Sequence, residues 1–259
     1  MNDARLIAFE RLLNIMDELR EQCPWDKKQT MESLRHLSIE EVYELSEAIL
    51  KNDREEIRKE LGDVLLHIVF YARIASETND FTITEVINSL CDKLIVRHPH
   101  IYGDVKVKDD EEVKQNWEQI KLKESGGKKR LLSGVPASLA SLVKAYRMQE
   151  KAAQVGFDWP TKELVWKKVE EELGEFKEAK TPQEREEELG DLLFALVNYA
   201  RFDGINPDDA LEKTNQKFKR RFEYIEAQAE LNGRELRNMN LDEMDAWWNE
   251  AKTKENKQA

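Results

Sequence analysis

Two pairs of acidic residues three positions apart could do chemistry in the first half of the chain. Glu41 and Glu44 form one pair, and Glu60 and Asp63 form the other. Residues three apart on an α-helix lie on one face, so each pair projects its carboxylates together. Two such helices packed antiparallel would gather four carboxylates, which repel one another unless a cation lies between them. Hard oxygen ligands with no cysteine nearby favour Mg²⁺ or Mn²⁺ over zinc.

The same acidic pattern recurs in the second half of the chain, in the same order. There Glu172 and Glu175 form the first pair, and Glu188 and Asp191 form the second. Because the chain has 53 acidic residues, a single cluster would be better explained as a solvated helix face. The ordered repeat favours a functional role, as do the apolar runs 64–72 and 192–197 that directly follow the two aspartates. We therefore predict a duplicated module with one carboxylate cluster in each half.

Lysine, arginine and tryptophan follow each acidic cluster at matching places. These residues are Lys93, Arg97 and Trp117 in the first half and Lys217, Arg221 and Trp248 in the second. Lysine and arginine one helical turn apart could clamp a polyphosphate, the arginine through two parallel hydrogen bonds. A tryptophan could stack on any nucleobase, and the alternative for Trp248 is a place in the core or at a dimer interface.

The elements that would position these residues are helices throughout. The chain is rich in Glu, Lys, Leu and Ala, has only 10 Gly and 6 Pro, and shows no alternating strand pattern. Ser38, with Glu41 three residues later, indicates a capping box that opens the second helix. We expect helices at about 3–21, 38–52, 53–77, 84–98, 109–123, 137–155, 162–179, 183–202, 207–232 and 241–255.

A glycine-containing basic stretch, residues 124–136, predicts the boundary between two domains. We expect an N-terminal domain at 1–125, a linker at 126–135 and a C-terminal domain at 136–259. The predicted fold class is all-α, with two tandem helical-bundle domains. Gly62 and Gly190 stand inside helices directly before the cluster aspartates, which suggests close approach of a neighbouring helix or a ligand.

The overall charge and the apolar pattern narrow the function classes. A net charge of −12 argues against a nucleic acid polymer as partner, but carboxylates can hold a small polyanion through divalent cations. Two cysteines, Cys23 and Cys91, are too few for a disulfide framework and suit a reducing cytoplasm. The N-terminal helix has no signal-peptide core, and the apolar run 64–72 is too short to cross a bilayer. We expect a cytoplasmic protein without membrane spans.

Taken together, these motifs resemble the MazG-like all-α nucleoside triphosphate pyrophosphohydrolases, which are relatives of the dimeric dUTPases. Glu-Glu-x-x-Glu followed by Glu-x-x-Asp is the acidic signature of that family, and the likeness to two-domain bacterial MazG covers nearly the whole chain. It includes the segments CPWDKKQT, RHPHIYGDV, VGFDW, EELGDLLFALVN and NQKFKRRF. The resemblance implies a homodimer that hydrolyses ribo- and deoxyribonucleoside triphosphates to monophosphate and pyrophosphate.

The resemblance also implies roles for residues of the second half. Mg²⁺, or Mn²⁺ in its place, would be bound by Glu172, Glu175, Glu188 and Asp191. The nucleotide would face Lys168, Glu187, Lys217, Arg221 and Trp248. The family has a basic residue near position 184, where this sequence has Glu184, so no phosphate contact is expected there.

The residue types fit this chemistry without the resemblance. Hydrolysis between the α and β phosphorus needs charge neutralisation and a placed water. Glu171 and Glu187 are both candidates to orient or deprotonate that water, and the sequence does not choose between them. One rival is a di-iron carboxylate bundle, which needs Glu-x-x-His, a motif that this sequence lacks. The other is a non-catalytic acidic adaptor, which would not require the repeated lysine, arginine and tryptophan.

The two halves differ beside the metal ligands. Lys59 in the first half aligns with Glu187 in the second, so a lysine replaces a carboxylate there. We therefore expect a weak or inactive first-half site, formed by Glu41, Glu44, Glu60, Asp63, Lys93, Arg97 and Trp117, and the resemblance likewise attributes catalysis to the C-terminal domain. His67, whose counterpart is Ala195, is expected to be a core histidine.

Overall fold

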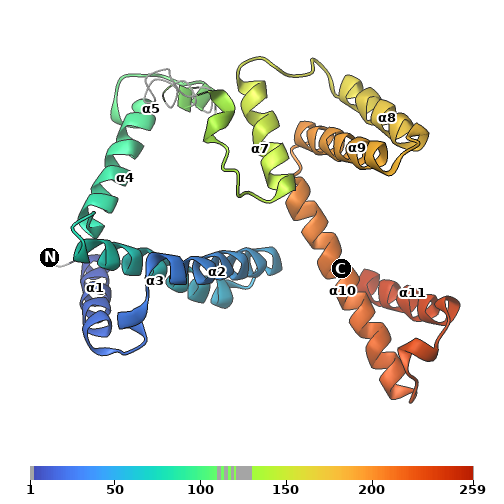
Figure 1. The fold of residues 1–259 in the computed structure, drawn as a ribbon, viewed down its shortest axis with the longest axis horizontal. Coiled ribbons are helices and arrows are strands. Elements are labelled where there is room, and N and C mark those ends of the chain that lie inside the picture. The colour runs from blue at the N-terminus through green and yellow to red at the C-terminus, as the bar shows by residue number, and fades with distance from the viewer. Residues whose placement is uncertain (1–2, 110–111, 114–115, 118–119, 121–129, 259) are drawn as a thin grey trace. The chain divides into compact units, whose positions relative to one another are not determined.

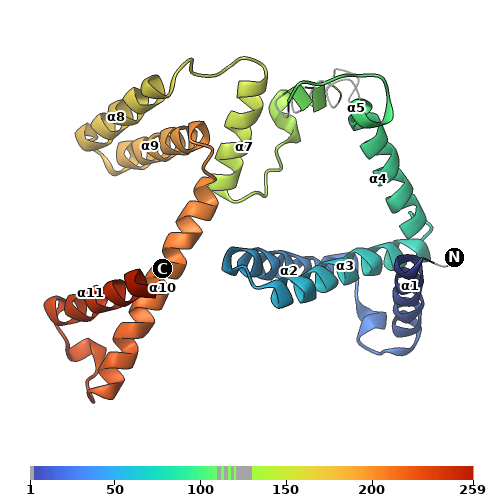
Figure 2. The same cartoon turned by 180° about the vertical axis from the view of Figure 1, so that it is seen from behind.

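The computed structural model describes residues 3–258 except 110–111, 114–115, 118–119 and 121–129 (Figures 1 and 2). Throughout this part of the chain the regular elements are helices and there is no strand, as the composition predicts. The chain divides into two compact units, residues 1–117 and 118–259. None of the helices in the described ranges is long and apolar enough to span a membrane.

The N-terminal unit is built around an antiparallel helical hairpin. Its elements are α1 (Ala4–Gln22), the 3₁₀ turn η1 (Asp26–Lys28), α2 (Met31–Lys51), α3 (Arg54–Glu77), α4 (Ile83–Arg97) and the one-turn α5 (Pro99–Tyr102). The hairpin is formed by α2 and α3. Its turn passes through Asn52 at a left-handed φ of 55°, which asparagine tolerates better than most residues. The Asp53 carboxylate then accepts hydrogen bonds from the backbone N–H groups of Glu55 and Glu56 and caps α3.

The core of this unit lies where α1 and α2 meet α3. It is formed by Met16, Leu34, Val69 and Phe70. The apolar run 64–72 is buried on one face of α3 only: Val69, Phe70 and Ala72 are buried, whereas Ile68 is 45% exposed.

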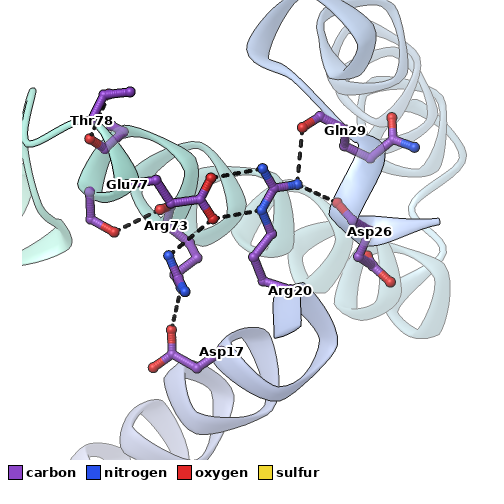
Figure 3. Close-up of polar contacts among 9 residues, drawn as sticks. Asp17, Arg20, Asp26, Gln29, Arg73, Glu77 and Thr78 are labelled. Carbon is purple, nitrogen blue, oxygen red and sulfur yellow. Dashed lines mark hydrogen bonds and ion pairs between the residues drawn. The ribbon is translucent and has the colours of Figure 1, made fainter. Parts of the chain in front are cut away.

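Arg20 fastens α1 and η1 to the end of α3 (Figure 3). Its guanidinium donates to the two carboxylate oxygens of Glu77 at 2.8 and 2.9 Å, and also to the backbone carbonyl oxygens of Asp26 and Gln29. The hydrogen bond from Arg20 is the main reason why the pKa of Glu77 lies below its usual range. This contact fixes the segment that leads into α2 and its acidic residues.

The predicted start of the second helix is wrong. Helix α2 begins at Met31, and its capping box pairs Thr30 with Ser33 rather than Ser38 with Glu41. Ser38 lies inside the helix, where its hydroxyl donates to the backbone carbonyl of Leu34 or bonds to His67 on α3. The Ser-x-x-Glu spacing at Ser38 is that of a capping box, but the Ser38 hydroxyl instead forms a hydrogen bond between α2 and α3.

The C-terminal unit contains a second antiparallel hairpin. Its elements are η2 (Leu131–Gly134), α7 (Ser141–Gln154), α8 (Lys162–Glu178), α9 (Pro182–Phe202), α10 (Pro207–Leu231), the 3₁₀ turn η3 (Leu236–Asn238) and α11 (Leu241–Gln258). The hairpin is formed by α8 and α9, with Val165, Val169 and Val197 buried. Helix α7 packs on α9, and α10 packs on α7 and pairs with α11.

Most helix bounds agree with the sequence-based expectation to within a few residues. The start of α2 differs most, because that helix begins at Met31 and not at 38. The start of α7 differs next, because Ala137–Ser138 form a turn and the helix begins at Ser141. The helix expected at 109–123 falls largely outside the described residues. Of the predicted linker, residues 126–129 lie outside them, and the described part, 130–135, contains η2.

Candidate metal and nucleotide site

Three carboxylates converge on the α8–α9 hairpin. Oxygen atoms of Glu172 on α8 and of Glu188 and Asp191 on α9 lie within 4.8 Å of one another. Glu172 is buried, Glu188 is half-buried and Asp191 is exposed, so the group opens from the hairpin toward its surface. Glu175, the fourth predicted ligand, lies outside this trio, but its negative charge contributes, after burial, to raising the pKa of Glu188.

The α2–α3 hairpin repeats this arrangement. Oxygen atoms of Glu41, Glu60 and Asp63 also lie within 4.8 Å of one another. Their positions correspond one by one to those of Glu172, Glu188 and Asp191, so the internal repeat seen in the sequence is a repeat of site geometry. Glu44, the counterpart of Glu175, again stands beside the trio and raises the pKa of Glu60.

The electrostatics of both clusters fit a site for a cation. Partial burial, followed by the charges of Glu175 and Asp191, raises the pKa of Glu188 above its usual range. Burial raises the pKa of Glu60 in the same way, and one oxygen of Glu60 is buried without a hydrogen-bond partner among the described residues. Like charges held this close are unfavourable by themselves. An oxygen-only donor set that gains from positive charge matches Mg²⁺ or Mn²⁺.

Lys168 is the cation nearest to the second cluster in the described contacts. Its ammonium group lies 2.7 Å from an oxygen of Glu171 and 2.7 Å from an oxygen of Glu172. The hydrogen bond with Glu171, followed by the one with Glu172, raises the pKa of Lys168. Lys168 therefore neutralises part of the negative charge of this cluster.

The residues before Glu188 and before its counterpart Glu60 differ in their contacts. Glu187 is exposed and accepts a hydrogen bond from the side-chain amide of Gln183 at 3.3 Å. Lys59, at the matching place, bonds to Glu56 at 2.7 Å. His67 is 9% exposed and bonds to Ser38, and burial lowers its pKa, which confirms the prediction of a core histidine.

The residues predicted to contact the triphosphate and the base, Lys217, Arg221 and Trp248, lie on α10 and α11. The Arg221 guanidinium lies 2.7 Å from Glu255 and 5.3 Å from the centre of the Trp248 ring, which also packs against Phe218. Lys217 lies one turn before Arg221 on the same helix. In the described part of the chain, these three predicted residues make no hydrogen bond, ion pair or ring contact with the carboxylates of α8 and α9.

The first-half counterparts are spread over α4 and the segment that follows it. Lys93 and Arg97 lie on α4, and the ring of Trp117 packs edge-on against His98 at 5.1 Å. His98 ends α4, and its ring nitrogen donates to the backbone carbonyl of Leu94 at 2.6 Å. This contact of His98 closes the C-terminal end of α4, directly before Pro99.

The expectation for the two helical glycines is wrong in one respect. A Cβ added to Gly62 or Gly190 would meet no atom within 4 Å, so no neighbouring helix of this chain requires a glycine there. Close approach of a ligand to Gly62 or Gly190 stays a prediction, and the open space would also admit a second copy of the chain.

Sequence reasoning did not single out Gln149. This side chain is 8% exposed, and its amide nitrogen donates to the backbone carbonyl of Phe194 at 2.8 Å. A single glutamine on an amphipathic helix carries no motif, so only the tertiary structure identifies it.

Two helical hairpins, each with three convergent carboxylates, define a tandem all-helical protein equipped to hold divalent cations. The MazG nucleotide pyrophosphohydrolase domain profile matches residues 29–102 and 161–225, so one match covers each hairpin. The chain belongs to this family, and its all-α fold is two MazG-type helical domains in tandem.

Two relatives match almost end to end. The chain is 48% identical over 249 residues to the nucleoside triphosphate pyrophosphohydrolase/pyrophosphatase MazG of Thermotoga maritima, and the match covers 95% of this chain and 96% of that protein. It is 40% identical over 257 residues to the nucleoside triphosphate pyrophosphohydrolase of Escherichia coli K12, with 95% and 98% covered. The crystal structure of a mazG-related protein from Thermotoga maritima aligns with 43% of this chain and 97% of its own at 29% identity and a TM-score of 0.39.

Proposed function

We propose that this protein hydrolyses ribo- and deoxyribonucleoside triphosphates at the α–β phosphoanhydride, giving nucleoside monophosphate and pyrophosphate. The observation that carries the proposal is the convergence of Glu172, Glu188 and Asp191 in a chain of the MazG family. The names of both full-length relatives describe the same reaction class. The two cysteines of the described chain are unpaired, which fits a reducing cytoplasm.

The metal would be Mg²⁺, with Mn²⁺ as a substitute, held by the carboxylates of Glu172, Glu175, Glu188 and Asp191. When bound there, it would supply positive charge against the phosphate oxygens and acidify water near the α phosphorus. The protein holds these oxygens on two packed helices. Partial burial and then the charges of the neighbouring carboxylates raise the pKa of Glu188, and a bound cation would offset both effects.

The chain offers two carboxylates for placing the attacking water. Glu171 is bound to Lys168 at 2.7 Å, whereas Glu187 contacts only the neutral amide of Gln183 among the described residues. A carboxylate without a cationic partner is the better proton acceptor, so we favour Glu187. Lys168 would move from Glu171 and Glu172 to a phosphate oxygen when the substrate arrives.

The triphosphate clamp would come from a second copy of the chain. Lys217, Arg221 and Trp248 lie together on α10 and α11 but do not contact the carboxylates of their own hairpin. The hairpin also leaves apolar side chains open, such as Leu193 at 47% exposure, and Gly190 leaves space for an approaching group. In a homodimer, the clamp of each copy would face the carboxylates of the other.

Mixing two inactive variants tests the shared site. Dimers formed by co-expressing Glu188→Gln and Arg221→Ala chains should recover up to about a quarter of the parent activity, because random pairing makes half of them mixed, each with one intact site. Activity is measured as pyrophosphate release from ATP by the purified mixture, with each variant alone as control. No recovery in dimers shown to be mixed would place the clamp in the same chain as the carboxylates.

The reaction products test the proposed function itself. With ATP and Mg²⁺, phosphorus NMR should detect AMP and intact pyrophosphate as the first products. The physical reason is that the carboxylates would hold the metal against the α and β phosphates and leave pyrophosphate as the leaving group. Early release of orthophosphate and ADP would mean attack at the γ phosphorus and would contradict the proposal.

A further inference from the structure

His67 lies between the carboxylate cluster of the first hairpin and a small polar network. Its side chain belongs to α3 and is 9% exposed. One ring nitrogen, Nδ1, lies 3.0 Å from the hydroxyl oxygen of Ser38 on α2, and the other, Nε2, lies 3.9 Å from a carboxylate oxygen of Glu41. The second hairpin has Ala195 at the place of His67, so its cluster has no imidazole there.

The contacts of Ser38 fix the position of the ring hydrogen. The Ser38 hydroxyl oxygen also lies 3.0 Å from the backbone carbonyl oxygen of Leu34 and 2.7 Å from the hydroxyl oxygen of Tyr71. A carbonyl oxygen can only accept, so the single hydroxyl hydrogen of Ser38 is donated to Leu34. The Tyr71 hydroxyl and the His67 Nδ1–H must then both donate to Ser38. Burial lowers the pKa of His67, so the ring is neutral at neutral pH and Nε2 carries a lone pair.

This lone pair lies close to carboxylate oxygens without a hydrogen bond to them. The separation of 3.9 Å between Nε2 and the Glu41 oxygen is too long for one. Glu41 belongs to the trio with Glu60 and Asp63, and one Glu60 oxygen is buried with no hydrogen-bond partner among the described residues. Asp63 stands four positions before His67 on α3, a spacing at which two side chains on one helix face can share a metal ion.

We propose that the His67 Nε2 atom is a fourth ligand of the first-hairpin cluster, which binds a divalent ion such as Zn²⁺ or Co²⁺ in preference to Mg²⁺. Imidazole nitrogen favours the late first-row transition metals, whereas carboxylate oxygen alone suits Mg²⁺. Histidines that bind a metal nearly always donate the hydrogen of the other ring nitrogen to a neighbouring acceptor, as His67 does to Ser38.

The bound ion would have a structural role that the proposed reaction does not use. It would join α2, through Glu41, to three ligands on α3. An ion held by both helices binds the folded unit and not the unfolded chain, so it stabilises the fold by mass action. With His67 the first cluster is not an oxygen-only site, whereas Ala195 leaves the second cluster to its carboxylates.

The test observes Co²⁺ bound to the first cluster alone. Full-length protein carrying Glu188→Gln and Asp191→Asn is mixed with an equimolar amount of Co²⁺, and its paramagnetic proton NMR spectrum is recorded in light and in heavy water. The Nδ1–H of a cobalt-bound imidazole should give one strongly shifted signal that disappears in heavy water. Adding His67→Ala, which reproduces Ala195 of the second hairpin, should abolish it. The matched control is His36→Ala, because His36 is exposed on α2, and there the signal should persist.

Calorimetry gives the size of the effect. Adding His67→Ala should weaken Co²⁺ binding by about tenfold or more, the scale of damage to a metal-binding shell, and should leave Mg²⁺ binding within about twofold. The comparison uses protein whose circular dichroism matches that of the parent. Equal losses for both ions would mean that His67 supports the hairpin without selecting the metal, and would overturn the proposal.

The remaining outcomes separate this site from the reaction. No Co²⁺ binding by the protein with the second cluster disabled, or Co²⁺ binding without a shifted imidazole signal, would overturn the proposal, and both readings leave His67 in place. A signal that survives His67→Ala or is lost in His36→Ala would assign the nitrogen ligand to another histidine and overturn it as well. Failure of the parent to hydrolyse ATP would contradict the proposed function and leave this metal site unaffected.

Discussion

Replacing Glu188 by Gln or Asp191 by Asn should lower Mg²⁺-dependent hydrolysis of ATP by at least about a hundredfold, the typical scale of damage to a metal-binding shell. Both substitutions keep the shape of the side chain and remove one negative ligand. The two residues share a face of α9 and complete the trio with Glu172, so neither has a substitute at its place. The measurement is initial-rate kinetics over a range of Mg²⁺ concentrations, together with Mn²⁺ binding followed by electron paramagnetic resonance.

Glu186→Gln is the matched control for this prediction. Glu186 lies on the same helix, is exposed and is not part of the convergent trio, so the same chemical change there should leave hydrolysis and Mn²⁺ binding near the parent values. Folding is not expected to suffer in the site variants, because each removes a charge from a cluster of like charges. Near-normal turnover by both site variants would contradict the assignment of Glu188 and Asp191 as metal ligands.

The helical hairpins and their carboxylates were predictable because their signals are local. Spacing of three places Glu188 and Asp191 on one face, and the antiparallel partner follows from the short connection at Ala179–Thr181. A single acidic cluster is weak evidence for a site, but the sequence contains the cluster twice in the same order, and the same trio of carboxylates occurs in both hairpins. The start of α4 was expected near residue 84, and the helix begins at Ile83, where Thr82 forms a capping box with Glu85.

The failures of prediction concern side chains whose role depends on a distant partner. Ser38 has the local pattern of a cap, but its hydroxyl contacts His67, 29 positions away. Gln149 has no local pattern, and its partner is the backbone of Phe194, 45 positions away. Gly190 was linked to a neighbouring helix or a ligand, and the described fold places no helix against it. Sequence spacing determines which face a residue occupies, whereas contacts across elements depend on how the helices pack.

The remaining prediction concerns the division of labour between the two hairpins. In full-length protein, the double variant Glu60→Gln, Asp63→Asn should hydrolyse ATP within about twofold of the parent rate, whereas the double variant Glu188→Gln, Asp191→Asn should be inactive on the hundredfold scale given above. The two pairs occupy the same places in geometrically equivalent clusters, so each double variant is the control for the other.

The expectation rests on what surrounds each trio. Beside Glu188 stands Glu187, an exposed carboxylate that can hold water, whereas Lys59 beside Glu60 can neither accept a proton when charged nor bind a cation. The Lys59 ammonium is bonded to Glu56 at 2.7 Å. The His67 Nε2 atom lies 3.9 Å from a carboxylate oxygen of Glu41. The second half has the small Ala195 at the position of His67, so the first cluster has a bulkier neighbouring side chain. The first hairpin thus keeps cation ligands without the group that would place the water.

A fragment of residues 130–259 extends this test, because the second compact unit carries the α8–α9 hairpin together with α7, α10 and α11. Its circular dichroism and its mass in solution are measured first, so that only a folded fragment of the same oligomeric state as the parent is compared. Such a fragment should hydrolyse ATP at close to the parent rate per chain, since it holds each residue assigned to metal, water, triphosphate and base. A folded, dimeric but inactive fragment, or loss of turnover in the Glu60→Gln, Asp63→Asn protein, would show that the N-terminal hairpin takes part in catalysis despite Lys59.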